Sequence, residues 1–215
     1  MRSIPLSAIA ALALAATTHA ADEKLGTVVE TSPDGRWEVR SLGKDVYTFR
    51  WNPDFYQSLF VVSATETLVV DPIGHAAAPH YREAIRRTTE APIRKVVYSH
   101  SHRDHIAGAK ELAPGAEIIA HANTRNRIIV RGDHDIPVPT RTVSDGDEIR
   151  AGEKVIHVHY FGPTHSDSLI ALTVDTGLGK LLMFVDAIEP GIPPIATWET
   201  STWMAMFPLW KALCA

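Results

Sequence analysis

Four side chains of the kinds that bind metal ions lie within six positions in residues 98–108, which read YSHSHRDHIAG. They are His100, His102, Asp104 and His105. Imidazole nitrogens and carboxylate oxygens are ligands for zinc, and also for iron or manganese. A catalytic zinc ion commonly has three protein ligands and a water, so four candidates indicate half of a two-metal site. The plainer alternative is a solvated, histidine-rich loop that binds no metal.

The cluster directly follows residues 93–99 (IRKVVYS), whose apolar run predicts a buried strand. Residues 107–113 predict a short helix and residues 116–120 the next strand, which together make a strand–helix–strand unit. In an extended loop, residues two positions apart point the same way, so His100 and His102 can bind one ion from one side. A turn can direct the remaining two ligands at a neighbouring point.

Further strands precede and follow this unit. The alternation of strands with helices predicts an α/β protein with buried sheets and helices outside. Residues 123–147 are polar and rich in Pro, Asp and Arg, so they are predicted to be mainly loop. The other strands are predicted over residues 37–42, 46–51, 58–63, 67–71, 155–161, 168–175 and 180–186, and one more helix over residues 76–89.

Composition is that of a globular protein. The chain has 215 residues, of which 45% are hydrophobic and 21% charged, and this length fits one domain with a substantial core. A net charge of −4 without a basic block gives no reason to expect binding to nucleic acid or an anionic membrane. The single cysteine, Cys214, excludes an internal disulfide.

The N-terminus has the layout of a cleaved secretory signal. Arg2 precedes an apolar run over residues 4–16, and small residues follow up to a predicted cleavage site after Ala20. The apolar run is shorter than the roughly 20 residues that span a bilayer. We therefore expect a signal peptide over residues 1–20, a mature domain over residues 21–215, and a periplasmic or secreted protein without a membrane anchor after cleavage.

The segment HSHRDH, placed after a buried strand, resembles the His-x-His-x-Asp-His signature of the metallo-β-lactamase superfamily. The resemblance covers roughly residues 46–188. It implies an αββα sandwich with two metals at one edge, here with an apparently shortened C-terminal half. It also implies that His100 and His102 serve the first metal and that Asp104 and His105 serve the second.

The later ligands of the family can be matched one at a time. His165, in YFGPTHSDS, matches the third ligand of the first metal, and Asp186, in LLMFVDAI, matches the carboxylate that bridges both metals. Without the resemblance, His165 reads equally well as a ligand or a turn residue, and Asp186 reads more often as a strand-end cap. Asp71, which ends TLVVD, matches an Asp near the metals that can orient a ligand. The family also supplies a final histidine to the second metal, whereas no histidine follows His165 here.

This site predicts metal-dependent hydrolysis. A divalent ion lowers the pKa of its bound water from ~15.7 to about 7 and so supplies hydroxide at neutral pH. We therefore expect a zinc-dependent hydrolase, with one or two ions, that acts on an ester, lactone, thioester or amide bond of a small molecule. Asp104 is the predicted catalytic residue, because it can both bind the second metal and orient the nucleophile by a hydrogen bond.

Three alternatives remain open. The stretch GPTHSDS looks like the corresponding part of β-lactamases, but Glu189 stands where one subclass has a cation for the antibiotic carboxylate. A chain without the last second-site ligand can also be a metal-binding pseudo-enzyme or a fragment. An oxidoreductase with iron is the third alternative. Substrate, metal identity and oligomeric state are not determined by the sequence.

Aromatic and histidine residues outside the cluster have plainer readings beside functional ones. Trp51, Phe55 and Tyr56 are predicted to contact an apolar part of the substrate or to close the sheet edge. His157 and His159 alternate on one strand and are predicted to lie on its polar face. An amphipathic helix predicted over residues 197–210 is expected to be core or a dimer face.

Overall fold

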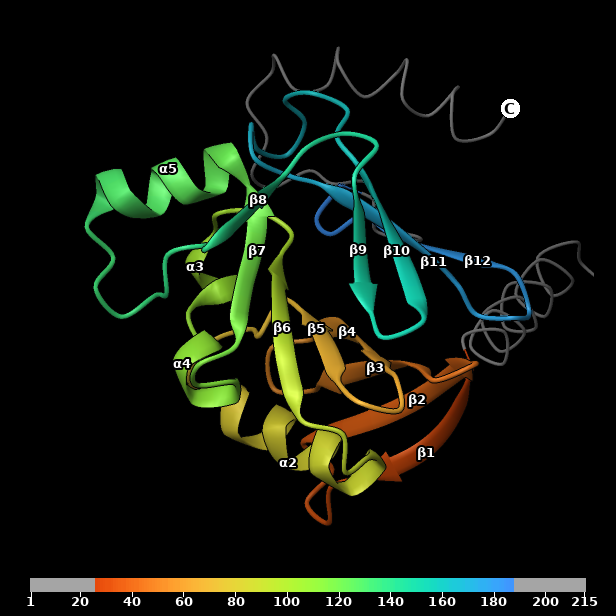
Figure 1. Ribbon diagram of the computed structural model, residues 1–215. Coiled ribbons are helices and arrows are strands. Elements are labelled where there is room, and N and C mark those ends of the chain that lie inside the picture. The colour runs from red at the N-terminus through yellow and green to blue at the C-terminus, as the bar shows by residue number, and fades with distance from the viewer. Residues whose placement is uncertain (1–25, 188–215) are drawn as a thin grey trace, which may run out of the picture.

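The computed structural model describes residues 26–187, which form two β-sheets with helices on the outer face of the larger one (Figure 1). These are three layers of the αββα sandwich of the metallo-β-lactamase type that the family resemblance implied. The predicted signal peptide, Glu189, the predicted helix over residues 197–210 and Cys214 lie outside the described residues.

The larger sheet has eight strands in the order of the sequence. Strands β1 to β5 pair antiparallel, and β5 to β8 pair parallel. Helices connect the parallel strands, as parallel pairing requires. The strands are β1 (Thr27–Thr31), β2 (Trp37–Gly43), β3 (Val46–Trp51), β4 (Tyr56–Val62), β5 (Thr67–Val70), β6 (Ile93–Tyr98), β7 (Glu117–His121) and β8 (Arg141–Val143).

The smaller sheet is antiparallel throughout, with the strand order β12-β11-β10-β9. Its strands are β9 (Glu148–Ala151), β10 (Lys154–His159), β11 (Ala171–Asp175) and β12 (Lys180–Met183). The predicted strand pair around residues 176–179 is therefore present as β11 and β12.

The helices are α2 (Ala78–Thr88), α3 (Arg103–Ile106), α4 (Ala109–Leu112) and α5 (Ala122–Arg131). In α2, a proline in the first turn favours the helix start, and Tyr81, Ala84 and Ile85 form the buried face. Among residues 26–187, no helix has both the length and the apolar content needed to cross a bilayer.

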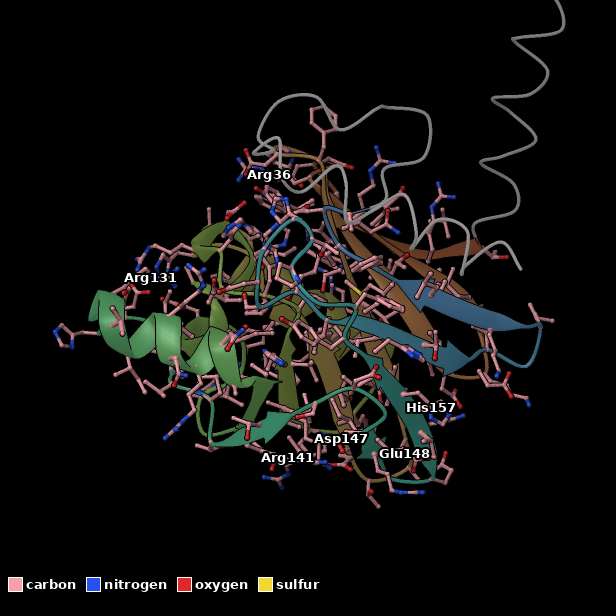
Figure 2. The ribbon with its side chains drawn as sticks, turned by 90° about the horizontal axis from the view of Figure 1, so that it is seen from above. Arg36, Arg131, Arg141, Asp147, Glu148 and His157 are labelled. Atoms are coloured by element: carbon pink, nitrogen blue, oxygen red, sulfur yellow. The ribbon has the colours of Figure 1, made fainter. Side chains whose placement is uncertain are left out.

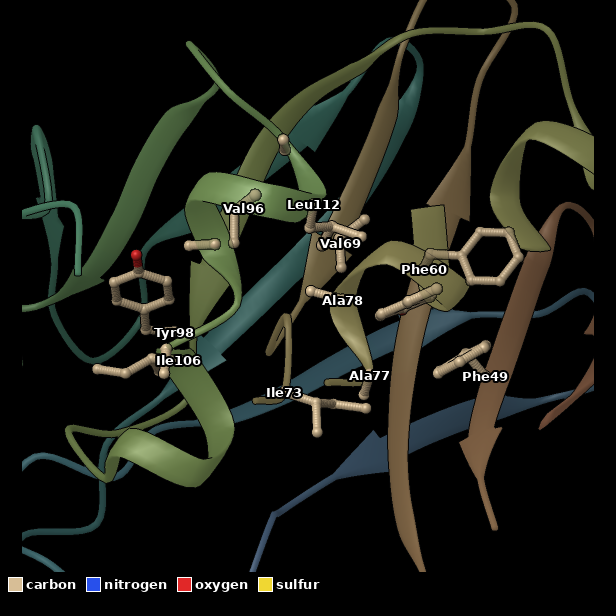
Figure 3. Packing of buried hydrophobic residues seen from close by; sticks show 14 of the residues in the cluster. Phe49, Phe60, Val69, Ile73, Ala77, Ala78, Val96, Tyr98, Ile106 and Leu112 are labelled. Atoms are coloured by element: carbon tan, nitrogen blue, oxygen red, sulfur yellow. The ribbon is translucent and has the colours of Figure 1, made fainter. Parts of the chain in front are cut away.

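Two apolar clusters hold the layers together, and β5 contributes to both. Val69 packs with α2 and α4 on one side of the larger sheet, whereas Leu68 and Val70 pack between the two sheets. Successive side chains of a strand point to opposite faces, so a strand buried on both faces reads as a continuous apolar run. Figure 3 shows the cluster beneath the helices, where Phe49 and Phe60 lie near the start of α2.

The prediction that residues 123–147 are mainly loop was wrong for the parts that form α5 and β8, whereas residues 132–140 and 144–147 are loop as predicted. Only Thr124 and Ile128 of α5 are buried, so the helix has little of the apolar periodicity that identifies helices in a sequence. Gly132 ends it with a left-handed φ of 69°, and the Asp133 amide donates to the Ile128 carbonyl at 3.3 Å. A glycine-capped polar helix was therefore read as a loop.

Candidate metal centre

The predicted ligands come from three separate parts of the chain that meet at one edge of the two sheets. His100 and His102 follow β6, His165 lies in the loop between β10 and β11, and Asp186 follows β12. Each of these residues is at or beyond the end of a strand, where the backbone is free to turn its side chain toward the others.

Four side chains form the first group. His100, His102, His165 and Asp186 each offer a ligand atom, and these atoms all lie within 4.8 Å of one another. His165 Nε2 is 3.1 Å from His102 Nδ1, and it is 3.4 Å from Asp186 Oδ2. The three imidazoles predicted for the first metal therefore converge, together with the predicted bridging carboxylate.

The predicted second-metal ligands adjoin this group. His105 Nε2 is 3.0 Å from Asp186 Oδ2 and 3.6 Å from Asp104 Oδ2. Asp186 Oδ2 is also 3.5 Å from His100 Nε2. One carboxylate oxygen of Asp186 thus lies between the two predicted ligand sets, as a carboxylate that bridges two ions must.

Asp104 and His105 lie on a helical turn. His102 is extended (φ −73°, ψ 137°) and immediately precedes α3, where helical geometry begins at Arg103. The start of α3 leaves the Asp104 side chain 52% exposed and His105 5% exposed. The predicted turn after His102 is therefore one turn of helix.

The segment after β5 holds α3 in place. The Ile73 amide donates to the His105 carbonyl, and the Gly108 amide donates to the Ile73 carbonyl, both at 2.8 Å. Gly108 separates α3 from α4, and a Cβ on it would lie 2.6 Å from the Cβ of Ala78. The absence of a side chain at this position lets the turn that carries His105 approach α2.

Asp71 and Ser99 orient His100. The Ser99 hydroxyl donates to Asp71 Oδ2 at 2.6 Å and lies 2.9 Å from His100 Nδ1. Because Nδ1 faces Ser99, the other ring nitrogen of His100 faces the ligand group. That atom, Nε2, is buried and has no hydrogen-bond partner among the described residues. A buried polar atom without a partner is costly, and an ion at this point would satisfy it.

Burial, followed by the neighbouring charges of His105 and His102, lowers the pKa of His100 to about 2. Burial and His165 likewise lower the pKa of His102. Both rings are therefore neutral near pH 7, which is the form that binds metal. The donor types, the convergence and the unsatisfied Nε2 atom fit a divalent ion.

His105 and Asp186 form a charged pair in the protein without metal. Burial opposes the charge on His105, but the carboxylates of Asp186 and Asp71, 3.0 and 3.6 Å from its ring nitrogens, outweigh it and raise the pKa to about 10. Burial likewise opposes the charge on Asp186, and the bond to His105 outweighs it, so the pKa falls to about 2. The proton on His105 stands in for the positive charge that an ion would supply.

Two residues that the sequence did not assign to the centre contact its ligands. Ser99 directly precedes the predicted ligand His100, so its place in the sequence could have identified it as a contact of that ligand. Tyr56 gives no such signal, because it is 48 positions from Asp104. Its hydroxyl donates to Asp104 Oδ2 at 2.5 Å, and its ring meets the His105 ring edge-on at 5.1 Å between centroids.

A cavity of about 620 Å³ opens beside the predicted second-metal ligands. It lies between the β3–β4 hairpin and the segment of β12 that leads to Asp186, and Phe55, which is 79% exposed, stands on its rim. The described lining residues include no lysine or arginine. They are Thr48, Asp54, Phe55, Tyr56, Gln57, Ser58, Leu59, His105, Leu181, Leu182, Met183, Phe184, Val185 and Asp186.

The histidines of β10 contact residues of the neighbouring strands β9 and β11. His157 is exposed and lies 3.6 Å from Glu148 on the neighbouring strand, and Figure 2 shows the two side by side at the surface. His159 Nε2 is 2.9 Å from the Thr173 hydroxyl. Both positions agree with the predicted polar strand face.

Comparison with known proteins points to one family. The family profile described as "Metallo-beta-lactamase superfamily" matches residues 51–206. The 2,4-dinitroanisole O-demethylase subunit alpha of Nocardioides sp. (strain JS1661) is 26% identical over 147 residues, which are 65% of this chain and 44% of that protein. The hydroxyacylglutathione hydrolase of Synechococcus sp. (strain CC9605) is 34% identical over 110 residues, which are 47% of this chain and 42% of that protein. The match thus spans less than half the length of each of these relatives.

Solved structures show the same fold. The FEZ-1 metallo-β-lactamase from Legionella gormanii aligns with a TM-score of 0.60 and 15% identity over 80% of this chain and 73% of that one. A metallo-β-lactamase with a HARLDQ motif from Cronobacter sakazakii aligns with a TM-score of 0.60 and 19% identity over 81% of this chain and 75% of that one. Because the family profile matches well over half of the 215 residues and the fold agrees, the chain belongs to the metallo-β-lactamase superfamily.

Proposed function

We propose that the chain is an exported hydrolase that uses zinc to cleave an ester, lactone, thioester or amide bond of a small molecule. The observation that supports this most directly is the convergence of His100, His102, His165 and Asp186, whose ligand atoms all lie within 4.8 Å of one another. Three imidazoles and a carboxylate are a donor set that suits zinc, with iron and manganese as alternatives.

Each ligand has a distinct part in this proposal. His100, His102 and His165 would hold the first ion, Asp104 and His105 would hold the second, and Asp186 would contact both. A divalent ion lowers the pKa of bound water to about 7, so it supplies hydroxide at neutral pH.

Asp104 is the catalytic residue of this proposal. More than half of its side chain is exposed, so it can meet both water and substrate. A carboxylate in this place can accept a hydrogen bond from the attacking water and so direct a lone pair of that water at the substrate carbonyl.

The cavity beside Asp186 is suited to a neutral, partly apolar substrate. Its described lining includes Leu181, Met183 and Phe184, together with the carboxylates of Asp54 and Asp186. The described lining includes no lysine or arginine that would pair with a carboxylate on the substrate. This favours uncharged esters, lactones and thioesters over β-lactam antibiotics, which carry a carboxylate.

Export is proposed from residues 1–20, which carry Arg2, an apolar run and a small-residue cleavage site. Expression of the full chain in a Gram-negative host followed by fractionation tests this. We expect a periplasmic product whose N-terminal residue is Ala21. A cytoplasmic product that keeps residues 1–20 would contradict export without affecting the hydrolase proposal.

One experiment tests the activity. The purified chain is assayed for metal content and for hydrolysis of a neutral aryl ester, a lactone, a thioester, an aryl methyl ether and a cephalosporin. We expect one or two zinc ions per chain, hydrolysis of at least one neutral ester-type substrate, loss of activity with a chelator, and recovery on adding Zn²⁺. A chain that binds metal and hydrolyses nothing in this panel favours the pseudo-enzyme alternative, and preference for the cephalosporin favours a β-lactamase.

A further inference from the structure

Tyr56 contacts both residues that are assigned to the second metal. Its hydroxyl donates to Asp104 Oδ2 at 2.5 Å, and its ring meets that of His105 at a centroid distance of 5.1 Å and an angle of 72°. A hydrogen bond to a carboxylate is about twice as strong as one between neutral groups. Asp104 is therefore tied to a side chain far away in the sequence.

The backbone of Tyr56 is held rigidly. It is the first residue of β4 and pairs with Trp51 at the end of β3. Trp51 is buried, stacks on the His80 ring of α2 at 5.1 Å and donates from Nε1 to Asp54 Oδ2 at 3.0 Å. A side chain that stands on a paired strand next to such an anchor can restrain a ligand that would otherwise be mobile.

Asp104 is the ligand that needs such restraint. Its side chain is 52% exposed, whereas the side chain of His105 beside it is 5% exposed. An exposed carboxylate loses side-chain freedom when it binds an ion, and a hydrogen bond made beforehand reduces that loss. A carboxylate offers about four lone-pair sites, so Asp104 can accept the bond from Tyr56 and still bind an ion.

We propose that Tyr56 is a positioning residue for the second metal: its hydroxyl fixes the Asp104 carboxylate in the orientation that binds this ion. The inference rests on the metal-dependent function proposed above. It also links the β3–β4 hairpin, which forms one wall of the cavity, to the metal centre. The hydrogen bond and the ring contact of the Tyr56 side chain are made to Asp104 and His105, so we expect the second ion to depend on this residue more than the first.

The test is the substitution Tyr56→Phe, which removes the hydroxyl and keeps the ring against His105. The matched control is Tyr47→Phe on β3 of the same hairpin, where the ring stacks on Phe60 at 5.0 Å. The full chain, stripped of metal, is titrated with Co²⁺, and both the affinity and the visible absorption of each equivalent are measured. Thermal unfolding of the metal-free proteins is measured in parallel.

We expect Tyr56→Phe to bind the first equivalent as the parent does and the second about 10–100-fold more weakly, as is typical when a partner of a metal ligand is lost. Tyr47→Phe should match the parent. Equal affinity for the second equivalent in Tyr56→Phe and the parent would overturn the inference. So would equal weakening of both equivalents, which indicates a general structural defect, or a parent that binds only one ion. A parent that binds none would refute the proposed function itself, which separates the two failures.

Discussion

The carboxylate of Asp71 accepts two hydrogen bonds from Ser99, one from the amide at 2.7 Å and one from the hydroxyl at 2.6 Å. This pair joins the ends of β5 and β6, two neighbouring parallel strands of the larger sheet that lead into the metal centre. The Ser99 hydroxyl also lies next to Nδ1 of His100. The orientation of the His100 ring therefore depends on the buried carboxylate of Asp71, which is 29 positions earlier in the chain.

Replacement of Asp71 should affect both stability and metal binding. Asp71→Ala leaves the buried amide and hydroxyl of Ser99 without an acceptor, so we expect the free energy of unfolding to fall by about 3 kcal/mol. Metal affinity should fall about 10–100-fold because His100 loses its orientation. Urea denaturation and metal titration measure these effects.

A conservative variant and a control variant test whether the effects of Asp71→Ala come from the lost hydrogen bonds to Ser99. Asp71→Asn keeps an acceptor and tolerates the left-handed φ of 46° at this position, so its loss of stability should be smaller. Asp175→Ala removes an exposed carboxylate that caps the Gly177 amide and should leave metal binding unchanged. Wild-type metal affinity in Asp71→Ala would show that the Ser99 bonds do not orient His100.

Removal of His102 should abolish hydrolysis. In the proposed centre its ring completes the first-metal set with His165, whose Nε2 is 3.1 Å from His102 Nδ1. We expect His102→Ala to lose at least one equivalent of metal and to lower kcat/KM by more than about 100-fold, because catalysis depends on the ion. Elemental analysis and steady-state kinetics measure both. His157→Ala, at an exposed position beside Glu148, is the control and should behave as the parent; full activity of His102→Ala would contradict the ligand assignment.

The metal-free protein should be most stable near neutral pH. The carboxylates of Asp186 and Asp71 hold the pKa of His105 at about 10 against an ordinary value of 6.5, so this stabilisation is complete below pH 6.5 and is lost as pH rises toward 10. The pKa of His100, lowered to about 2 by burial, acts in the opposite direction: stability falls as pH drops below 6.5, because only the unfolded chain then takes up the proton.

Urea denaturation in the presence of a chelator checks this dependence. We expect the free energy of unfolding to decrease by about 3 kcal/mol from pH 6.5 to about pH 9. The variant His105→Gln should lose most of that alkaline decrease, since its side chain does not titrate. A parent whose stability is constant over this range would show that the charged pair with Asp186 is not formed.

A substitution at Gly108 tests whether close packing against α2 positions α3. A Cβ at this position would lie 2.6 Å from Ala78 Cβ and 2.9 Å from the Gly74 carbonyl oxygen. Gly108→Ala should therefore cost about 1–3 kcal/mol by overpacking and should weaken metal binding through His105. The control is Gly74→Ala, where a Cβ meets no atom within 4 Å. Thermal and urea unfolding compare the two, and equal stability of both variants would show that the loop yields without cost.

Several features could be predicted from the sequence because they are local. The apolar runs of β5 and β6 identify strands buried on both faces, and HSHRDH places four ligand-type residues within one short segment. Helix α5 is also local, but most of its side chains are exposed, so no apolar period distinguished it from a loop. Where a residue's neighbours in the chain are also its neighbours in space, the hydrophobic pattern and the residue types were sufficient to predict the local structure.

The family resemblance had implied that His165, Asp186 and Asp71 lie near the metals, but only the tertiary structure decided how these distant segments meet. His165 and Asp186 reach His100 only because the smaller sheet packs on the larger one, and no local rule fixes that packing. The bond between Tyr56 and Asp104 depends on the pairing of β3 with β4 and on the helical turn of α3, and neither residue's own segment indicates it. The sequence thus determined which atoms can bind a metal. Folding decided which of them meet, because distances between remote residues follow from how sheets pair and pack.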